Sequence, residues 1–241
     1  MTPEVTVVIP VFNEERIVGR AVRELCAALR SEPRSFEVLL AENGSWDGTL
    51  GELERLAVEL PEVRFFCVGE PNYGRALREG LTRARGELVV CEEIDIGDVA
   101  FHRRALDLIV RGSADVVVGS KLHREARDRR PILRHAASHV YAGLLRVAVG
   151  YRGTDTHGLK ALRRRAVLPI LAECVVDKDV FASELVIRAE RRGLRVVEVP
   201  VDLAEKRPPS IDLVRRVPAV LSRVVRLAIA LRRRRPSTAR R

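Results

Sequence analysis

Apolar and polar positions along this chain follow two different periods. The runs EVTVVIPVF (4–12) and FEVLLAE (36–42) are almost uninterrupted and β-branched, which is typical of strands buried on both faces. Within 17–29, apolar residues recur every three or four positions, and this spacing predicts an amphipathic helix. Strands that alternate with helices indicate an α/β protein with a parallel sheet, which binds ligands at the carboxyl ends of its strands.

The same two periods predict the order of the remaining elements. Asn13 is expected to cap a helix that runs through Leu29, and Thr49 with Glu52 has the pattern of a capping box for the next helix. Further strands are expected at 63–69, 87–93, 115–121 and 194–201, and further helices at 74–85, 101–111, 135–149 and 181–192. The charged stretch 122–134 has no clear period and is predicted to be a loop.

Composition places the chain among single-domain α/β proteins. Its 241 residues are 46% hydrophobic, enough for one substantial core. No apolar run reaches the roughly 18 residues of a membrane span, and no signal-peptide pattern opens the chain, so we expect a cytoplasmic protein. The four cysteines lie far apart in apolar runs, which favours buried, reduced thiols. The Pro208-Pro209 pair is expected to separate a domain of residues 1–207 from a tail of residues 208–241.

The positive charge is concentrated in this tail. Residues 206–241 hold twelve basic side chains and one acid, which more than accounts for the net charge of +10 and leaves residues 1–205 near neutral. Apolar residues recur at helical spacing over 211–235, with arginines on the remaining faces. Two interpretations stay open: a helix packed on the domain, or a helix lying on an anionic membrane surface at its inner face. No DNA- or RNA-binding motif accompanies the charge, so nucleic acid is not the expected partner.

A cluster of carboxylates follows the strand expected at 87–93. It comprises Glu87, Glu92, Glu93, Asp95 and Asp98, in and just before the stretch CEEIDIGD (91–98). Like charges at the end of a buried strand repel one another and lose hydration unless a cation compensates them. The cluster is therefore either a solvated loop rim or a site for a metal ion.

Further candidate site residues are expected at the same edge of the sheet. The first, second and fourth strands deliver Pro10, Phe12, Asn13, Glu14, Glu42, Asn43, Glu93, Ile94 and Asp95. Because side chains alternate along a strand, Glu93 and Asp95 are expected to point the same way. Such a pair can share one hard cation, Mg²⁺ or Mn²⁺, together with substrate phosphates.

Six segments resemble the motifs of one enzyme family. They are VVIPVFNEE (7–15), ENGSWDGT (42–49), NYGRALREGLTRARGE (72–87), the acidic strand end, TDTHGLKALRR (154–164) and FASELVIRAERRGLRVVEVPV (181–201). In order and spacing they resemble a family-2 glycosyltransferase of the GT-A fold, similar to the dolichol- or polyprenyl-phosphate mannose synthases. The resemblance implies a Rossmann-like fold with a mostly parallel central sheet flanked by helices, extended here by the basic amphipathic C-terminal helix.

The resemblance implies a site for a nucleotide-sugar at this edge. The residues that would hold the base and ribose are Pro10, Phe12, Glu14, Leu40 and Glu42. Glu42 takes the place of the family's base-binding acid, and Leu40 would line the base. Asn43 stands where the family has an aspartate, which removes a negative charge near the ribose.

The resemblance also implies a metal ion and basic partners for the phosphates. Glu93-Ile94-Asp95 stands where the family has Asp-x-Asp, with Ile94 beside the substrate. Glu93 and Asp95 would bind Mg²⁺ or Mn²⁺, with Asp95 as the main ligand and hence a catalytic residue. The glutamate at 93 is a departure that moves its carboxylate by about one bond length. The basic residues that would face the phosphates are Lys121, Lys206 and Arg207.

The implied reaction is attack on the anomeric carbon of a sugar, with inversion. The donor would be GDP-mannose or a UDP-sugar, and the acceptor a polyprenyl phosphate whose oxygen is already ionised. A hydroxyl acceptor would need a general base, for which Asp155 and Asp179 are candidates beside structural roles. Glu184 matches a family acid, and a structural role is favoured for it. The alternative function is a non-catalytic relative that binds membranes or nucleic acid, which the departures at Glu93 and Asn43 would suit.

Overall fold

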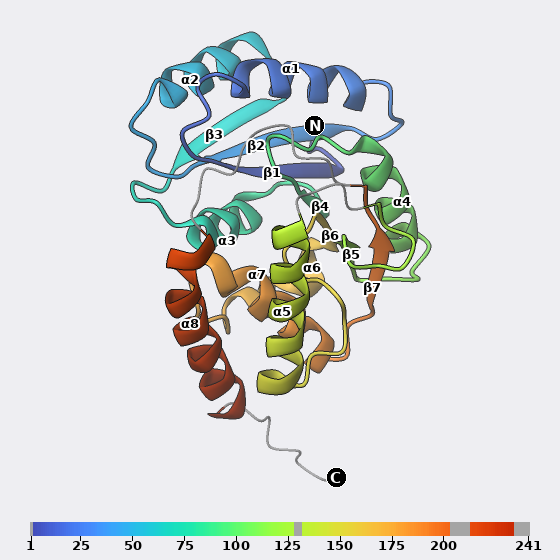
Figure 1. Ribbon diagram of the computed structural model, residues 1–241. Helices are drawn as coiled ribbons and strands as arrows, with labels where there is room; N and C mark the ends of the chain where they lie inside the picture. Colours follow the sequence, from blue (N-terminus) through green and yellow to red (C-terminus); the bar gives the residue numbers. More distant parts are fainter. Residues whose placement is uncertain (1, 128–131, 203–212, 234–241) are drawn as a thin grey trace.

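The computed structural model describes residues 2–127, 132–202 and 213–233 (Figure 1). Its strands are β1 (Val5–Val11), β2 (Phe36–Glu42), β3 (Val63–Cys67), β4 (Leu88–Cys91), β5 (Val116–Ser120), β6 (Lys160–Arg163) and β7 (Val196–Pro200). Its α-helices are α1 (Val18–Leu29), α2 (Thr49–Glu59), α3 (Tyr73–Arg83), α4 (Val99–Val110), α5 (Ile132–Val149), α6 (Arg164–Leu171), α7 (Phe181–Arg191) and α8 (Leu213–Arg233). A short 3-10 helix, η1 (Lys178–Val180), precedes α7.

The strands of the described residues form one sheet in the order β3-β2-β1-β4-β6-β5-β7. Neighbouring strands in it are parallel, except that β6 runs antiparallel to both β4 and β5. The predicted, mostly parallel α/β sheet is therefore confirmed. The sequence pattern predicts neither β6 nor α6, because a strand of four residues (KALR) that begins and ends with a cation has no recognisable β period.

Helices cover both faces of the sheet, with α1, α2 and α4 on one side and α3 and α5 to α8 on the other (Figure 1). Successive residues of β1 divide between the two cores. Val7 and Ile9 lie in the core under α1, α2 and α4, whereas Val8 lies in the opposite core. This burial on both faces explains why the strand sequences are uninterrupted apolar runs.

The loops after β1 and β2 differ from the prediction. Asn13 has a φ of 54° and does not cap α1, which begins at Val18. Its Oδ1 instead accepts a hydrogen bond from Trp46 N (3.0 Å). Thr49 is the first residue of α2 and not its cap, and its hydroxyl accepts a hydrogen bond from Glu14 N (2.8 Å). Both capping predictions are wrong because these side chains join two loops that are distant in sequence.

The cysteines are free thiols. Cys26, Cys91 and Cys174 are buried, as predicted. Cys67 is exposed, which corrects the prediction for this position. It ends β3, an edge strand with a sheet neighbour on one side only.

Helix α8 packs on the domain along one of its faces. The side chains that it buries there are Val224, Leu227 and Leu231. This agrees with the first of the two interpretations of the tail, and membrane binding stays a prediction. The predicted boundary between residues 207 and 208 lies outside the described residues. In the part of the chain that is described, no helix is both long and apolar enough to cross a membrane.

Candidate active site

Backbone hydrogen bonds hold the carboxyl ends of β1, β2 and β4 at one edge of the sheet, which is called the carboxyl edge below. Val11 pairs with Glu42 across β1 and β2, and Val8 pairs with Cys91 across β1 and β4. Beyond the last paired residues, Asn43 N donates to Val11 O (2.9 Å). The segments predicted to bind the base and the metal therefore lie side by side, at the edge where parallel sheets bind ligands.

Aromatic and acidic side chains form the part of this edge predicted to hold the base. The rings of Phe12 and Trp46 meet edge to face with their centroids 5.0 Å apart, and Trp46 is 77% exposed. Glu42 is nearly enclosed, and its carboxylate accepts a hydrogen bond from Ser45 N (2.5 Å). An accessible aromatic surface beside a hydrogen-bond acceptor is the combination that a nucleobase needs.

The other residues predicted for the base and ribose differ in accessibility. Leu40 is completely buried in the core under α1, α2 and α4, so its side chain offers no surface to a ligand in this structure. Glu14 is 7% exposed, whereas Pro10 is half-buried. Asn43 accepts a hydrogen bond from Asn72 N (2.6 Å), which ties the loop after β2 to the start of α3.

Three of the five clustered carboxylates have partners that explain them. Glu87 pairs with Arg165 (3.1 Å), and Glu92 contacts His102 (2.6 Å). Asp98 accepts a hydrogen bond from Phe101 N in the first turn of α4 (2.8 Å). Glu92 and His102 are both buried. Glu93 and Asp95 lie in the turn that follows β4, and this pair is called the acidic turn below.

The acidic turn corrects one part of the prediction. β4 ends at Cys91, so strand alternation does not align Glu93 and Asp95. The chain turns instead, and Ile96 N donates to Glu93 O (3.0 Å). The two carboxylates are nevertheless close enough to interact. Desolvation by the surrounding domain raises the pKa of Glu93, and the negative charge of Asp95 raises it further, although water still reaches the Glu93 side chain.

The atoms of the acidic turn fit a hard divalent cation. Carboxylate oxygens are the ligands that Mg²⁺ and Mn²⁺ prefer, and a shared cation relieves the repulsion between two adjacent carboxylates. Within the described ranges, no group of three or more His, Cys, Asp or Glu side chains is arranged to hold a metal ion. A pair of carboxylates can hold Mg²⁺ in an open site, where substrate phosphates supply further oxygens.

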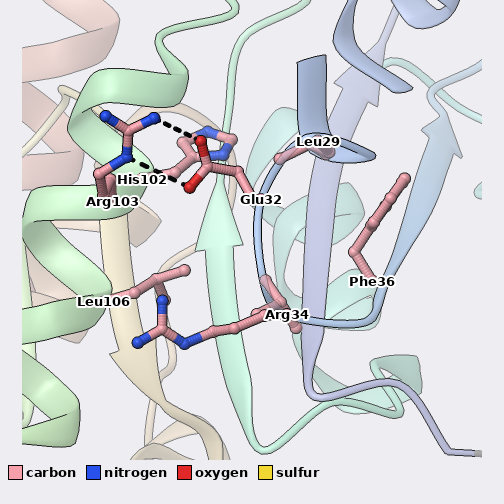
Figure 2. A pocket seen from close by; sticks show the side chains of 8 residues that line it. Leu29, Glu32, Arg34, Phe36, His102, Arg103 and Leu106 are labelled. Carbon is pink, nitrogen blue, oxygen red and sulfur yellow. Dashed lines mark hydrogen bonds and ion pairs between the residues drawn. The ribbon is translucent and has the colours of Figure 1, made fainter. Parts of the chain in front are cut away.

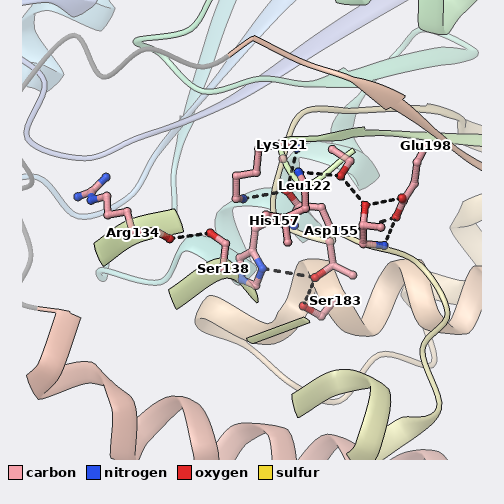
Figure 3. A network of polar contacts seen from close by, with 12 residues as sticks. Lys121, Leu122, Arg134, Ser138, Asp155, His157, Ser183 and Glu198 are labelled. Carbon is pink, nitrogen blue, oxygen red and sulfur yellow. Dashed lines mark hydrogen bonds and ion pairs between the residues drawn. The ribbon is translucent and has the colours of Figure 1, made fainter. Parts of the chain in front are cut away.

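Lys121, after β5, and Asp155, before β6, form a nearly buried ion pair (Figure 3). Nζ of Lys121 lies 2.9 Å from Oδ2 of Asp155, and the two side chains are 11% and 5% exposed. Burial by itself would raise the pKa of Asp155. The charge of Lys121 and a hydrogen bond from His157 N (2.9 Å) outweigh burial and lower this pKa to about 2. Asp155 is therefore ionised at neutral pH and is a weak base.

Glu198 of β7 holds the loop that carries Asp155 (Figure 3). Its carboxylate accepts hydrogen bonds from Thr154 N and Thr154 Oγ1, both at 2.6 Å, and from Asp155 N at 3.2 Å. The sequence interpretation missed Glu198, because it treated VVEVPV only as a strand. A single carboxylate inside this apolar run is the signal that could have pointed to it.

The side chains of three further predicted residues lie outside the described part of the chain. Asp179 belongs to η1, but its side chain is outside the described residues, as are Lys206 and Arg207. Glu184 is fully buried, and its carboxylate pairs with Arg188 (2.7 Å) and accepts hydrogen bonds from two backbone N–H groups. These contacts agree with the structural role favoured for Glu184.

A small cavity lies elsewhere, near the amino ends of β1 and β2 (Figure 2). Apolar side chains such as Leu29, Phe36 and Leu106 line it, and the ion pair between Arg103 and Glu32 lies beside them. Its described lining includes none of the residues predicted for the donor, the metal or the acceptor. The cavity is therefore separate from the carboxyl edge.

Comparison with known proteins identifies the family of this chain. A family model described as Glycosyl transferase family 2 matches residues 6–170, which contain all but the first residue of β1, the strands β2 to β6 and the acidic turn. The chain belongs to glycosyltransferase family 2. Within this family, glycosyltransferase AglD of Haloferax volcanii is 34% identical over 229 residues, which cover 92% of this chain and 36% of AglD. The dolichyl-phosphate beta-glucosyltransferase ALG5A of Trichomonas vaginalis is 25% identical over 214 residues, which cover 83% of this chain and 65% of that protein.

This family 2 glycosyltransferase chain thus spans about a third of AglD and just under two thirds of ALG5A. A solved structure also resembles it over nearly its whole length. Glucosyl-3-phosphoglycerate synthase from Mycobacterium tuberculosis, in complex with Mn²⁺, UDP and glucosyl-3-phosphoglycerate, superimposes with a TM-score of 0.68 at 18% identity. The match covers 98% of this chain and 82% of the synthase, and it confirms the predicted GT-A fold.

Proposed function

We propose that this protein transfers a sugar, with inversion, from a nucleotide-sugar to a polyprenyl phosphate. The observation that carries the proposal is the position of the acidic turn at the same sheet edge as Phe12 and Glu42, so the proposed metal ligands would lie beside the proposed surface for a base. The name of the relative ALG5A, a dolichyl-phosphate beta-glucosyltransferase, supports the same class of reaction.

Glu93 and Asp95 would hold Mg²⁺ or Mn²⁺, and the bound ion would supply positive charge to the diphosphate leaving group. Phe12 and Trp46 would contact the base, with Glu42 as an acceptor for its N–H groups. We take uracil as the first base to test, because the synthase with the same fold was solved with UDP and Mn²⁺.

The state of Asp155 supports an acceptor that needs no general base. With a pKa of about 2 and Lys121 as its partner, Asp155 is too weak a base to take a proton from a hydroxyl group. A lipid phosphate is already ionised and needs no such step. We therefore assign to Asp155 the role of orienting Lys121 toward phosphate, and Asp179 stays the candidate base for a hydroxyl acceptor.

A polyprenyl acceptor requires contact with a membrane, and α8 offers a surface for it. Leu221, Val225 and Ile229 recur at each turn of α8 and are exposed. On the neighbouring helix α5, Val140 and Val147 are exposed as well (Figure 1). Each arginine of the tail near an anionic lipid surface would add about 1 kcal/mol of attraction. We propose that the protein binds peripherally to the anionic, cytoplasmic face of a membrane.

Calorimetric titration with UDP and with GDP, each with and without Mn²⁺, tests the donor site. We expect one nucleotide to bind, and we expect its binding to require the metal. If neither nucleotide binds in the presence of Mn²⁺, the transferase proposal is wrong. Salt-sensitive binding of duplex DNA in the same preparation would then favour the non-catalytic alternative.

A further inference from the structure

Lys160, the first residue of β6, is a buried lysine in the middle of the carboxyl edge. In the sheet it pairs with Cys91 of β4 and with Val118 of β5, so it lies between the acidic turn and the Lys121–Asp155 pair. The residue is 1% exposed. Its Nζ donates a hydrogen bond to Gly158 O (2.6 Å), and no carboxylate oxygen of the described residues is within ion-pair distance of it.

Charges on both sides of the site act on this ammonium group. Burial lowers the pKa of Lys160, and the nearby Cys91, Asp155 and Glu93 raise it without restoring its usual value. Desolvation and the charge of Asp95 raise the pKa of Glu93, whereas the positive charges of Lys121 and Lys160 lower it. The electrostatic influence of Lys160 therefore reaches both the acidic turn and the ion pair.

A purely structural role does not explain a lysine at this position. A buried ammonium that contacts one carbonyl has lost its hydration with little compensation, and a well-packed aliphatic side chain is often at least as stable. Arg188 shows the contrast, because this similarly buried cation pairs with Glu184 at 2.7 Å. Lys160 has no such partner among the described residues, although it lies close to a strongly acidic site.

We propose that Lys160, which pairs with Cys91 at the end of β4 just before the acidic turn, is a positioning residue of the donor site, whose positive charge favours an anionic nucleotide and opposes a bare cation. This inference rests on the proposed function. Two carboxylates and a diphosphate carry more negative charge than one divalent cation neutralises, so a buried cation beside them stabilises the assembled complex. Lys121 acts on Glu93 as well, and more strongly than Lys160, but Lys121 already has an ion-pair partner in Asp155.

This role predicts effects of opposite sign for the metal and for the nucleotide. The variant Lys160→Met removes the charge and keeps an unbranched side chain that packs well. Without the repulsion, Mn²⁺ alone should bind several-fold more tightly, as measured from the free Mn²⁺ signal in electron paramagnetic resonance. At saturating Mn²⁺, UDP (or GDP, if that is the nucleotide that binds) should bind about tenfold more weakly in calorimetry. The melting temperature should be unchanged or higher.

Two further variants separate charge from packing. Lys160→Gln keeps a donor for Gly158 O but carries no charge. It should therefore also bind Mn²⁺ more tightly and the nucleotide more weakly than the wild-type protein. If Lys160→Met does not fold, Lys160→Gln tests the positioning role in its place. Arg188→Met removes a buried cation that has an ion-pair partner. It should lower the melting temperature and leave both affinities of the folded protein unchanged.

The outcomes distinguish this inference from the proposed function. If the wild-type protein shows no Mn²⁺-dependent nucleotide binding, both are overturned. If the wild-type protein binds and the two Lys160 variants match it for Mn²⁺ and nucleotide, only the positioning role is overturned. A large fall in melting temperature in both Lys160 variants, with unchanged affinities in the folded fraction, would show that Lys160 is structural.

Discussion

Lys121 Nζ lies 2.9 Å from Asp155 Oδ2, in an ion pair that is almost closed to water. The contact joins the end of β5 to the loop before β6, and Glu198 of β7 fixes that loop from the other side. The cation expected to face phosphate is therefore paired with a carboxylate in this structure. If phosphate binds at Lys121, as proposed, it would share this cation with Asp155.

The ion pair should make stability depend on pH in the acid range. The pKa of Asp155 falls from its usual 3.8 to about 2, so its stabilising contribution is complete above about pH 4 and is lost as the pH falls through 2. At pH 7, Asp155→Asn should lower the free energy of unfolding by about 2 kcal/mol. Urea unfolding at several pH values checks this, since the difference between the two proteins should narrow below about pH 4. A difference that stays constant with pH would contradict the assignment.

The acidic turn should account for the metal dependence of nucleotide binding. Asp95→Asn removes one of two charged oxygen ligands, so the affinity for Mn²⁺ should fall by about tenfold or more, and UDP binding should lose its metal dependence. Asp98→Asn is the matched control, because Asp98 caps α4 and asparagine caps helices equally well. Calorimetry should show wild-type behaviour for Asp98→Asn. Equal losses in both variants would argue against a specific site.

Glu184 should matter for stability and not for the donor. Replacing it with glutamine leaves Arg188 as a buried charge without its counter-ion, which should cost about 3 kcal/mol of unfolding free energy. Chemical denaturation measures this loss. Calorimetry on the folded variant should give the wild-type affinity for UDP and Mn²⁺, and a selective loss of nucleotide binding would instead place Glu184 in the site.

The exposed face of α8 should bind anionic lipid. Replacing Leu221, Val225 and Ile229 by serine removes apolar side chains that face solvent, so the variant should fold normally but sediment less with anionic vesicles. Val224→Ser is the control on the same helix, because Val224 is buried and its replacement should destabilise the protein by about 1 to 3 kcal/mol. Undiminished vesicle binding by the triple variant would rule out this face. Deleting residues 211–241 is a poorer test, since it also removes the core residue Leu227.

Local sequence was sufficient to predict which segments meet at the candidate site. The segments PVFNE and ENGSWDGT each follow a run that is apolar enough to be a central strand, and parallel pairing of β1 with β2 and β4 brings their ends together. The roles of Asn13 and Thr49 were mistaken, because each side chain bonds to a loop more than thirty residues away. Leu40 was expected beside the base, but a strand covered on both faces buries it completely.

The sequence by itself determined the alternation of strands and helices, the family motifs and the acidic stretch after β4, because these depend on the period and the order of residues along the chain. Only the tertiary structure decided that β6 enters the sheet antiparallel between β4 and β5, and this insertion brings Lys160 opposite Cys91, just before the acidic turn, and Asp155 to Lys121. Those contacts join segments that are distant in sequence. The charged side chains in them have shifted pKa values because they are buried together, and no local sequence pattern encodes this burial.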